Sequence, residues 1–304
     1  MIKLNFIVIA FIFYISSYAQ TVVVLNSIKD NTIYQEAENS NGKGENFFSG
    51  TTSSGVGNAR RALIKFDVSS IPAGAVISAA TLNLFCNKTN NGSGVRNFNL
   101  HKLNSDWGEG VSYAGSSNDG SGVTATAGDA TWACRFSNGS GGCTSGWTNA
   151  GGDITLTSSA VKPVNAAGVS YSWSSAQMIT DIQNWITTPS TNFGWALIGD
   201  ESASLSAKRF GARENATTLQ RPTLSVTYTV ATVCPGINTW TGSVSSAWET
   251  PGNWSCGVIP GATTQVIINS GPVIVNSNAI CKTININPTV IFTVNTGFNF
   301  TVLQ

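Results

Sequence analysis

Seven basic side chains and two tryptophans have the chemistry that best suits an acidic ligand built from rings. The basic candidates are Arg60, Arg61, His101, Lys102, Lys208, Arg209 and Arg213. Arginine binds carboxylates through paired hydrogen bonds, so these residues predict a local basic groove even on a chain of low net charge. Trp107 and Trp132 fall in predicted loops, where an exposed indole could stack on a sugar face. For Arg213 the competing interpretation is an internal ion pair with Glu214.

Three carboxylates predict a structural calcium site. Asp106 and Glu109 lie in the run DWGEG, and Asp129 follows the Gly- and Ser-rich stretch 108–128. Carboxylate and backbone carbonyl oxygens are the hard ligands that Ca²⁺ prefers. The competing interpretation is that these acids only cap turns and solvate a long surface loop. A loop of this kind is also where binding residues commonly occur.

The same residues give little support for catalysis. Two carboxylates such as Asp106 and Glu109 could hydrolyse a glycoside, but nothing in the sequence sets the separation or the raised pKa that this reaction needs. His101 is the only histidine, and its one conceivable role in a lyase would be as a base beside Tyr113. Its position in an alternating segment favours a structural or ligand-binding role. We therefore expect no enzyme activity and no catalytic residues.

Six cysteines are typical of an oxidising compartment, where disulfides persist. Cys134 and Cys143 flank a short Gly/Ser loop, and we expect them to be bonded. A weaker second pairing joins Cys256 to Cys281. The remaining pairings stay open, because six cysteines allow 15 combinations. A zinc site is not expected, since the sequence has no CxxC motif and a single histidine.

The N-terminus has the pattern of an export signal. Lys3 supplies a positive charge, residues 6–15 are apolar, and Ser17 to Ala19 are suited to cleavage. An apolar run this short is typical of a signal peptide rather than a spanning helix. We predict a signal peptide over residues 1–19, with an uncleaved anchor as the alternative. The mature protein is then expected outside the cell or on its surface, with no membrane insertion.

The charge balance excludes two classes of partner. Lys and Arg total 16 and Asp and Glu total 15, and Lys3 belongs to the predicted signal peptide, so the mature chain has no net charge. A general grip on nucleic acid or on an anionic membrane needs an excess of basic residues. Charged residues make up 10% of the chain and hydrophobic residues 41%, which is enough for a core. Such a composition is typical of β-rich extracellular proteins.

Hydrophobic patterning predicts the elements that must position these residues. Residues 62–68 and 95–103 alternate apolar and polar side chains, and 76–85, 130–136, 171–173, 193–199 and 223–230 are further predicted strands. One helix is expected from Ser174 or Ser175 to Pro189, with Trp185 on its apolar face and Trp173 beside it in the core. The pattern predicts an all-β chain: an antiparallel, jelly-roll-like β-sandwich with one short helix over residues 21–230.

The composition changes near residues 230–235. Trp240, Trp248 and Trp254 follow closely, and short β-branched runs separated by Asn, Gly and Pro occupy the rest of the chain. Short strands at steady spacing predict a smaller β-solenoid-like module over residues 234–304. Because this pattern runs up to Gln304, we expect the sequence to be the N-terminal part of a longer protein.

Several runs in the middle of the chain resemble a known family. They are NGKG (41–44), RRALIKFDVSSIPAGAVISAATLNL (60–84), LHKLNSDWGEG (100–110), GDATW (128–132), DIQNW (181–185), NFGWALIGDES (192–202), AKRFGARE (207–214) and RPTLSVTY (221–228). Together they resemble the DNRLRE-domain family of secreted bacterial proteins, which overlaps carbohydrate-binding module family 96. The resemblance covers about two thirds of the chain, and the loop between Cys134 and Cys143 departs from it.

This resemblance implies a β-sandwich that binds acidic polysaccharide, alginate in particular. The C-terminal runs W-x-G and N-W-x-x-G-x-x-P, from Trp240 to Pro260, resemble a module of large secreted bacterial proteins that precedes β-solenoid strands. We therefore expect a secreted, non-catalytic carbohydrate-binding protein whose partner is a polysaccharide. A structural adhesin without sugar specificity is the alternative, and a polysaccharide-degrading enzyme comes third.

Overall fold

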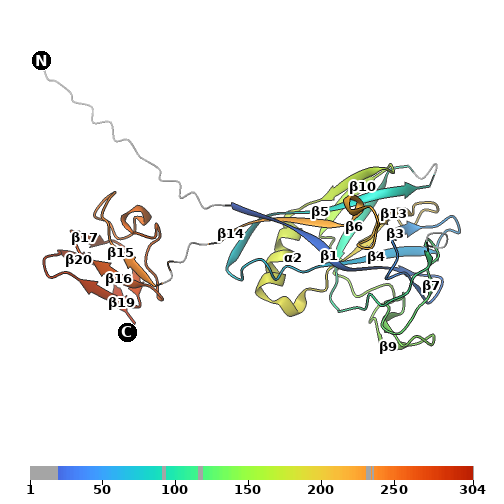
Figure 1. The fold of residues 1–304 in the computed structure, drawn as a ribbon, viewed down its shortest axis with the longest axis horizontal. Helices are drawn as coiled ribbons and strands as arrows, with labels where there is room; N and C mark the ends of the chain where they lie inside the picture. Colours follow the sequence, from blue (N-terminus) through green and yellow to red (C-terminus); the bar gives the residue numbers. More distant parts are fainter. Residues whose placement is uncertain (1–19, 91–93, 116–118, 231–233, 235, 304) are drawn as a thin grey trace, which may run out of the picture. The chain divides into compact units, whose positions relative to one another are not determined.

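The computed structural model describes residues 20–303 except 91–93, 116–118, 231–233 and 235. The chain divides into two compact units, a barrel unit that ends at Val230 and a C-terminal unit after it (Figure 1). The predicted signal peptide, residues 1–19, lies outside the described residues. Among the described residues, no helix is long and apolar enough to cross a membrane.

Six antiparallel strands close into a barrel in the first unit. They are β1 (Gln20–Tyr34), β14 (Thr223–Val230), β5 (Ala75–Thr89), β13 (Lys208–Gly211), β3 (Asn46–Thr51) and β4 (Ala59–Phe66), in that order. The ring closes because β1 pairs with β14 over its first half and with β4 over its second half. A register shift between Ser27 and Lys29 separates the two halves. The expectation of a mostly β chain is confirmed, but β1 joins the two sheets of the expected sandwich into one closed sheet.

Further strands extend the barrel on both sides. Next to β4 lie β12 (Trp195–Ile198), β6 (Arg96–Lys102) and β10 (Ala160–Val164), and β11 (Val169–Trp173) pairs with β5. The inward side chains of these strands form the main hydrophobic core, which contains Phe66, Leu84, Trp195 and Phe210. Burial of this apolar surface is the main driving force that holds the unit together.

The one α-helix of the described residues is α2 (Ala176–Thr187). Ser175 caps it by accepting a hydrogen bond from the Met178 N–H at 3.0 Å, and Pro189 opens the 3₁₀ turn η1 (Pro189–Thr191) that follows. Ile182 and Trp185 lie on the buried face of the helix and pack into the main core. The predicted cap, stop and apolar face are therefore confirmed.

The connection from β6 to β10 is a folded layer and not only a surface loop. Within it, β8 (Cys134–Ser137) pairs with β9 (Cys143–Gly146), and β7 (Val123–Thr124) pairs with β2 (Asn39–Ser40), which lies between β1 and β3. Trp107, Ala130 and Trp147 pack from this layer onto Leu63 and Ala196 in a second hydrophobic cluster. The layer thus covers the outer face of β4 and β12.

The C-terminal unit is built from small parallel sheets. The pairings are β15 (Ile237–Thr239) with β16 (Gln265–Ile268) and β19 (Thr283–Ile286), β17 (Val273–Val275) with β20 (Phe292–Val294), and β18 (Ala279–Cys281) with β21 (Phe300–Val302). This unit also contains the 3₁₀ turn η3 (Pro251–Asn253), and the barrel unit contains η2 (Thr218–Gln220) just before β14. Trp240, Trp248 and Trp254 pack with Val266 and Ile268 in the core of this unit.

Each unit contains one disulfide. The expected bond between Cys134 and Cys143 is present, with the two Cα atoms 5.2 Å apart. The second expected pairing is wrong, because Cys256 is bonded to Cys234 and not to Cys281. The Cys281 side chain lies on β18 and is fully buried in the apolar core, where it stays a free thiol.

Candidate functional site

A hollow of about 270 Å³ lies at the end of the barrel where β3 and β5 end and β4 and β13 begin. We call this hollow the basic groove. Its lining residues are Phe48, Thr52, Ser53, Arg60, Lys88, Thr89, Asn90, Asp119, Gly120, Ser121, Ala207, Lys208 and Arg209. It therefore brings together three of the predicted cations and adds Lys88, with Asp119 as the one acid among its lining residues.

Lys88 and Arg209 lie directly opposite each other on β5 and β13. Like charges at opposing positions of an antiparallel pair destabilise the sheet. Arg209 is partly neutralised by Asp119, to which its Nη1 donates at 3.2 Å, and its Nε donates to the neutral Asn87 amide at 2.7 Å. Lys88 is exposed. An anion that binds between the two cations would relieve their repulsion.

Arg60 and Lys208 form the rigid base of the groove. The Arg60 side chain is only 4% exposed, bonds to Glu36 and Gly120, and lies 5.0 Å from the ring centroid of Tyr34. Lys208 is fully buried, and burial lowers the pKa of its amine. Both residues are predicted from the sequence to contact a ligand. Both side chains add positive potential to the groove, but they are too buried for a ligand to contact much of their surface.

Three predicted cations lie elsewhere. Arg61 follows Arg60 in β4 and so points to the opposite face, where it pairs with Glu201 at 2.7 Å and lies 4.7 Å from the Trp132 ring centroid. His101 Nδ1 lies 3.0 Å from the Thr155 carbonyl, and Lys102 is its neighbour on β6. None of these residues lines the basic groove.

Arg213 belongs to a third location, an ion-pair network that ties β1 to two distant loops. Its guanidinium donates to both carboxylate oxygens of Glu109, at 2.6 and 2.8 Å, and also lies 2.8 Å from Glu214. Lys43 donates to Glu109 at 2.9 Å. The predicted pair of Arg213 with Glu214 is therefore present, but as one part of a larger network.

The acids of this network are Asp30, Glu109 and Glu214, whose oxygens lie within 4.8 Å of one another and could hold a metal ion. Burial raises the pKa of Asp30 and of Glu214. Burial alone would also raise the pKa of Glu109, but hydrogen bonds from Arg213 and Lys43 hold it below its usual value. A metal would have to compete with these two cations.

The calcium ligands expected from the sequence are not gathered at one point. Asp106 pairs with Lys29 at 3.0 Å, and Asp129 is buried and accepts hydrogen bonds from the N–H and hydroxyl of Thr126. Glu109 is the only member of the expected set in the acidic group. Each carboxylate is already satisfied by a different neighbour, so this prediction needs correction.

The tryptophans expected to stack on sugars need correction too. Trp107 is fully buried, and its indole N–H donates to the Phe193 carbonyl at 2.9 Å. Trp132 is half-buried beneath Arg61, away from the basic groove. Both indoles instead pack in the hydrophobic cluster between the folded layer and β4.

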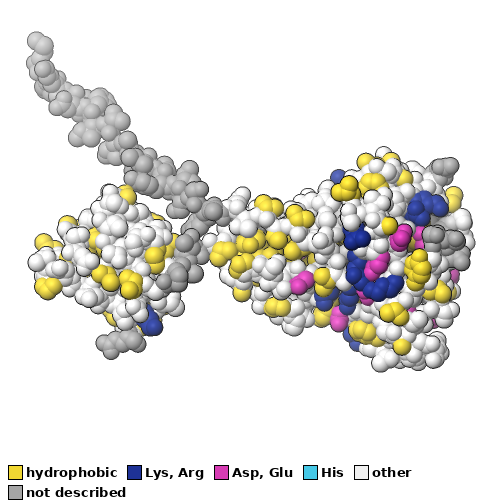
Figure 2. Space-filling view, viewed as in Figure 1, with side chains coloured by type: hydrophobic (Ala, Val, Ile, Leu, Met, Phe, Trp, Pro, Cys, Tyr) yellow, Lys and Arg dark blue, Asp and Glu magenta, His cyan; other side chains and the backbone are white. Residues whose placement is uncertain are grey.

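Figure 2 shows how the charges are distributed over one face of the barrel unit. Lys and Arg side chains lie interspersed with Asp and Glu there, and few charges appear elsewhere on that view. This mixture explains why a search for basic residues alone overestimates the number that can bind a ligand. Most arginines of this unit already have a carboxylate partner.

Comparisons with known families support part of the resemblance seen in the sequence. Residues 21–113 match the model of carbohydrate-binding module family 96. This match spans β1 to β6 and includes Arg60 and Lys88, whereas Arg209 lies outside it. A second model, described as a domain of unknown function (DUF8693), matches residues 239–304. A comparison with curated proteins finds no match. Carbohydrate-binding modules are non-catalytic, and the second domain is uncharacterised.

Proposed function

We propose that the barrel unit binds an acidic polysaccharide such as alginate in the basic groove. The observation that carries this proposal is the cross-strand pair of Lys88 and Arg209, two like charges held opposite each other at the mouth of a hollow. Uronate polymers carry a carboxylate on every ring. A carboxylate between the two side chains would accept charge-assisted hydrogen bonds from both.

The match to a carbohydrate-binding module family supports the class of ligand, and the charge of the groove supports its acidity. Hydroxyl and amide side chains such as Thr52, Ser53 and Asn90 line the rest of the hollow and suit sugar hydroxyls. We expect the groove to bind sugar without hydrolysing it. Asp119 is the only acid among the lining residues, and it is paired with Arg209. A glycosidase would need two carboxylates.

The two disulfides and the family match fit an extracellular protein, and we propose secretion to the cell exterior or surface. We further propose that the parallel ladders of the C-terminal unit are turns of a β-solenoid-like surface module. In this arrangement the barrel unit supplies the sugar specificity. The competing function, a structural adhesin, would need no basic groove.

The test uses a charge reversal at Lys88. Lys88→Glu places an acid opposite Arg209, so we expect the melting temperature to stay the same or rise. Because the variant removes a cation from the groove, we expect alginate affinity to fall about tenfold or more. Lys102→Glu is the matched control, since it makes the same change in net charge on β6, outside the groove. Affinity electrophoresis in alginate gels at low and high salt measures both proteins.

Unchanged alginate retention by Lys88→Glu would overturn the basic groove as the binding site. Absence of retention of the unmodified protein on any acidic glycan would favour the adhesin. Shortened alginate chains after incubation with the unmodified protein would favour an enzyme.

A further inference from the structure

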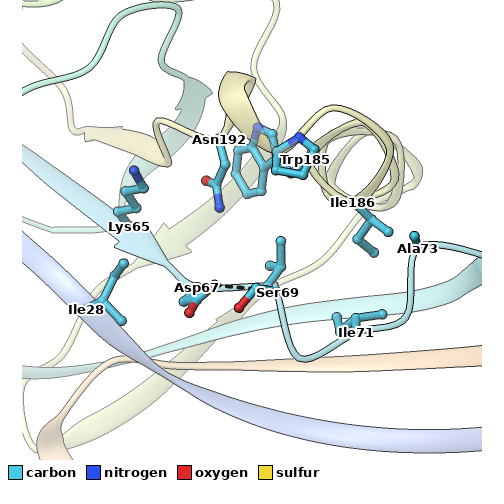
Figure 3. A pocket seen from close by; sticks show the side chains of 11 residues that line it. Ile28, Lys65, Asp67, Ser69, Ile71, Ala73, Trp185, Ile186 and Asn192 are labelled. Carbon is cyan, nitrogen blue, oxygen red and sulfur yellow. Dashed lines mark hydrogen bonds between the residues drawn. The ribbon is translucent and has the colours of Figure 1, made fainter.

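A second hollow, of about 360 Å³, lies at the opposite end of β4 from the basic groove. We call it the helix-end pocket, because the last turn of α2 forms one wall and the connection from β4 to β5 forms the other (Figure 3). Its lining residues are Ile28, Lys65, Asp67, Val68, Ser69, Ile71, Ala73, Trp185, Ile186, Pro189 and Asn192. The walls are mostly apolar, with Lys65 and Asp67 of opposite charge among them.

Two polar atoms among the lining residues are buried without a hydrogen-bond partner. They are the indole Nε1 of Trp185 and the amide Oδ1 of Asn192, on residues that are 1% and 8% exposed. The Asn192 amide is fixed from its other side, because Nδ2 donates to the Phe66 carbonyl at 2.9 Å. Figure 3 shows this amide directed into the space that Lys65, Asp67 and Ser69 border.

Trp185 differs in this respect from its neighbours in the barrel unit. The indole N–H groups of Trp107, Trp147, Trp173 and Trp195 each donate to a carbonyl or carboxylate at 2.9 Å. Leaving a buried polar group unpaired costs about 1–3 kcal/mol. An unpaired donor and an unpaired acceptor on two residues that line one pocket therefore point to a ligand with polar groups.

The chemistry of that group follows from the two atoms. The Trp185 N–H needs an acceptor and the Asn192 oxygen needs a donor, and hydroxyl groups can act as either. An ionised ligand would lose its hydration against the apolar walls, which is costly without a paired charge. Lys65 and Asp67 offset each other, so the pocket offers an ionised ligand no net charge to pair with. We therefore expect an uncharged ligand, with an apolar face for Ile71 and Ile186.

We propose that the helix-end pocket is a second subsite that binds a neutral, hydroxyl-bearing ring, namely a neutral pyranose unit of a glycan. Binding brings sugar hydroxyls to the Trp185 N–H and to the Asn192 oxygen after a small opening of the pocket. This inference rests on the carbohydrate-binding function proposed above but uses different residues, so the two can fail separately.

The test blocks the pocket from its rim. Ala73 is exposed, and Ala73→Trp fills the hollow without removing a core side chain, while Ala150→Trp adds the same indole at another exposed alanine as the control. The probes are cellotriose, xylotriose and mannotriose as neutral glycans and an alginate hexasaccharide as the acidic one. Calorimetric titration of the full protein measures each affinity.

We expect at least one neutral trisaccharide to bind, with about a tenfold or larger loss in Ala73→Trp and no loss in Ala150→Trp or Lys88→Glu. In ¹⁵N spectra the Trp185 indole signal, identified by its absence in Trp185→Phe, should shift with that sugar. The inference is overturned if no neutral trisaccharide binds, if Ala73→Trp binds it normally, or if the Trp185 signal does not move. The pocket would then hold water only. Alginate binding, lost in Lys88→Glu alone, reports on the basic groove independently.

Discussion

The two units of this protein are stabilised by different kinds of interaction. All ten ion pairs among the described residues lie between Lys29 and Glu214, in the barrel unit. The C-terminal unit contains only Glu249 and Lys282 as charged residues. Its core has instead a chain of aromatic contacts, in which Trp248 lies 4.6 Å from Trp254 and 5.0 Å from Phe300 between ring centroids.

This difference follows from how each unit connects its strands. The barrel joins distant segments through long loops, and pairs such as Arg213 with Glu109 fix these loops to the sheet across 104 residues of sequence. The C-terminal unit has short parallel strands that pair with strands 18–28 residues away, and flat rings fill the space between them. Charge networks respond to pH and salt, whereas aromatic packing responds mainly to changes in volume.

The largest effect should come from the aromatic core. Trp248 is 1% exposed, so Trp248→Ala is expected to cost the C-terminal unit about 3–5 kcal/mol of unfolding free energy. Urea unfolding followed by circular dichroism measures this, with the partly exposed Ile259→Ala as the control. A cost below 1 kcal/mol would show that the rings are not the main source of stability.

The disulfides offer a matched pair of deletions, one in each unit. The chain-entropy model gives about 3.4 kcal/mol for the Cys234–Cys256 bond and about 2.6 kcal/mol for Cys134–Cys143, because the first closes the longer loop. Double serine variants at each bond, compared in urea unfolding, measure the two costs. A larger cost at Cys134–Cys143 would contradict this order and indicate that the β8–β9 hairpin supports the folded layer enthalpically.

The ion-pair network should give a smaller effect, confined to the barrel unit. Arg213→Ala leaves Glu109 with Lys43 as its remaining cation and the Asp30 N–H as a further donor, and we expect a loss of about 2 kcal/mol. Lys102→Ala is the control, since Lys102 has no hydrogen bond or ion pair through its side chain among the described residues, and its effect should stay within about 0.5 kcal/mol. Equal effects of the two variants would argue against the network.

The smallest effect concerns pH. The pKa of Asp30 is raised in the folded state, so the folded protein binds this proton more tightly than the unfolded chain does. Asp30 therefore favours folding most at low pH, and its contribution to stability falls as pH rises above the ordinary carboxyl pKa of about 4. Asp30→Asn keeps an oxygen for the Arg213 N–H and should raise the melting temperature at pH 8 by about 2–4 °C, with the gain vanishing toward pH 3.

Asp67→Asn is the matched control with the opposite sign. Hydrogen bonds from Ser69 lower the pKa of Asp67, so its stabilising contribution is present at neutral pH and is lost as pH falls through the carboxyl range. This variant should therefore lower the melting temperature slightly at pH 8. Two variants that shift it in the same direction would show that burial does not control Asp30.

The sequence predicts local structure in the barrel unit well and long-range pairing poorly. The helix from Ala176 to Thr187 is predicted because its cap, apolar face and terminating proline all lie within fifteen residues. Barrel closure depends on the register shift between Ser27 and Lys29, which no local pattern encodes. The disulfide between Cys134 and Cys143 is local in sequence and therefore predictable. The partner of Cys256 depends on how the segments of the C-terminal unit fold together, which the sequence pattern does not show.

The candidate site shows the same limit. Arg60 and Arg209 are identified by residue type, but Lys88 is not, because its position opposite Arg209 depends on the pairing of β5 with β13. Arg61 is a false candidate for a simple geometric reason: adjacent residues of a strand face opposite sides. Trp107 is misplaced because a Gly-rich stretch gives no signal that it folds back as a layer with its own core.

Strand β4 connects the two proposed subsites, since Arg60 lies in the basic groove and Lys65 in the helix-end pocket. At about 3.3 Å per residue the five residues from Arg60 to Lys65 span about 17 Å, and the hydrogen-bonded sheet makes this separation rigid. The two side chains face opposite sides of the strand, so a polymer that reaches both subsites must pass around the edge or end of the sheet. A single polymer that reaches both subsites would bind the second at high effective concentration. The barrel would then discriminate among polysaccharides by the spacing between their acidic and neutral blocks, and a mixed chain would gain an avidity that neither homopolymer has.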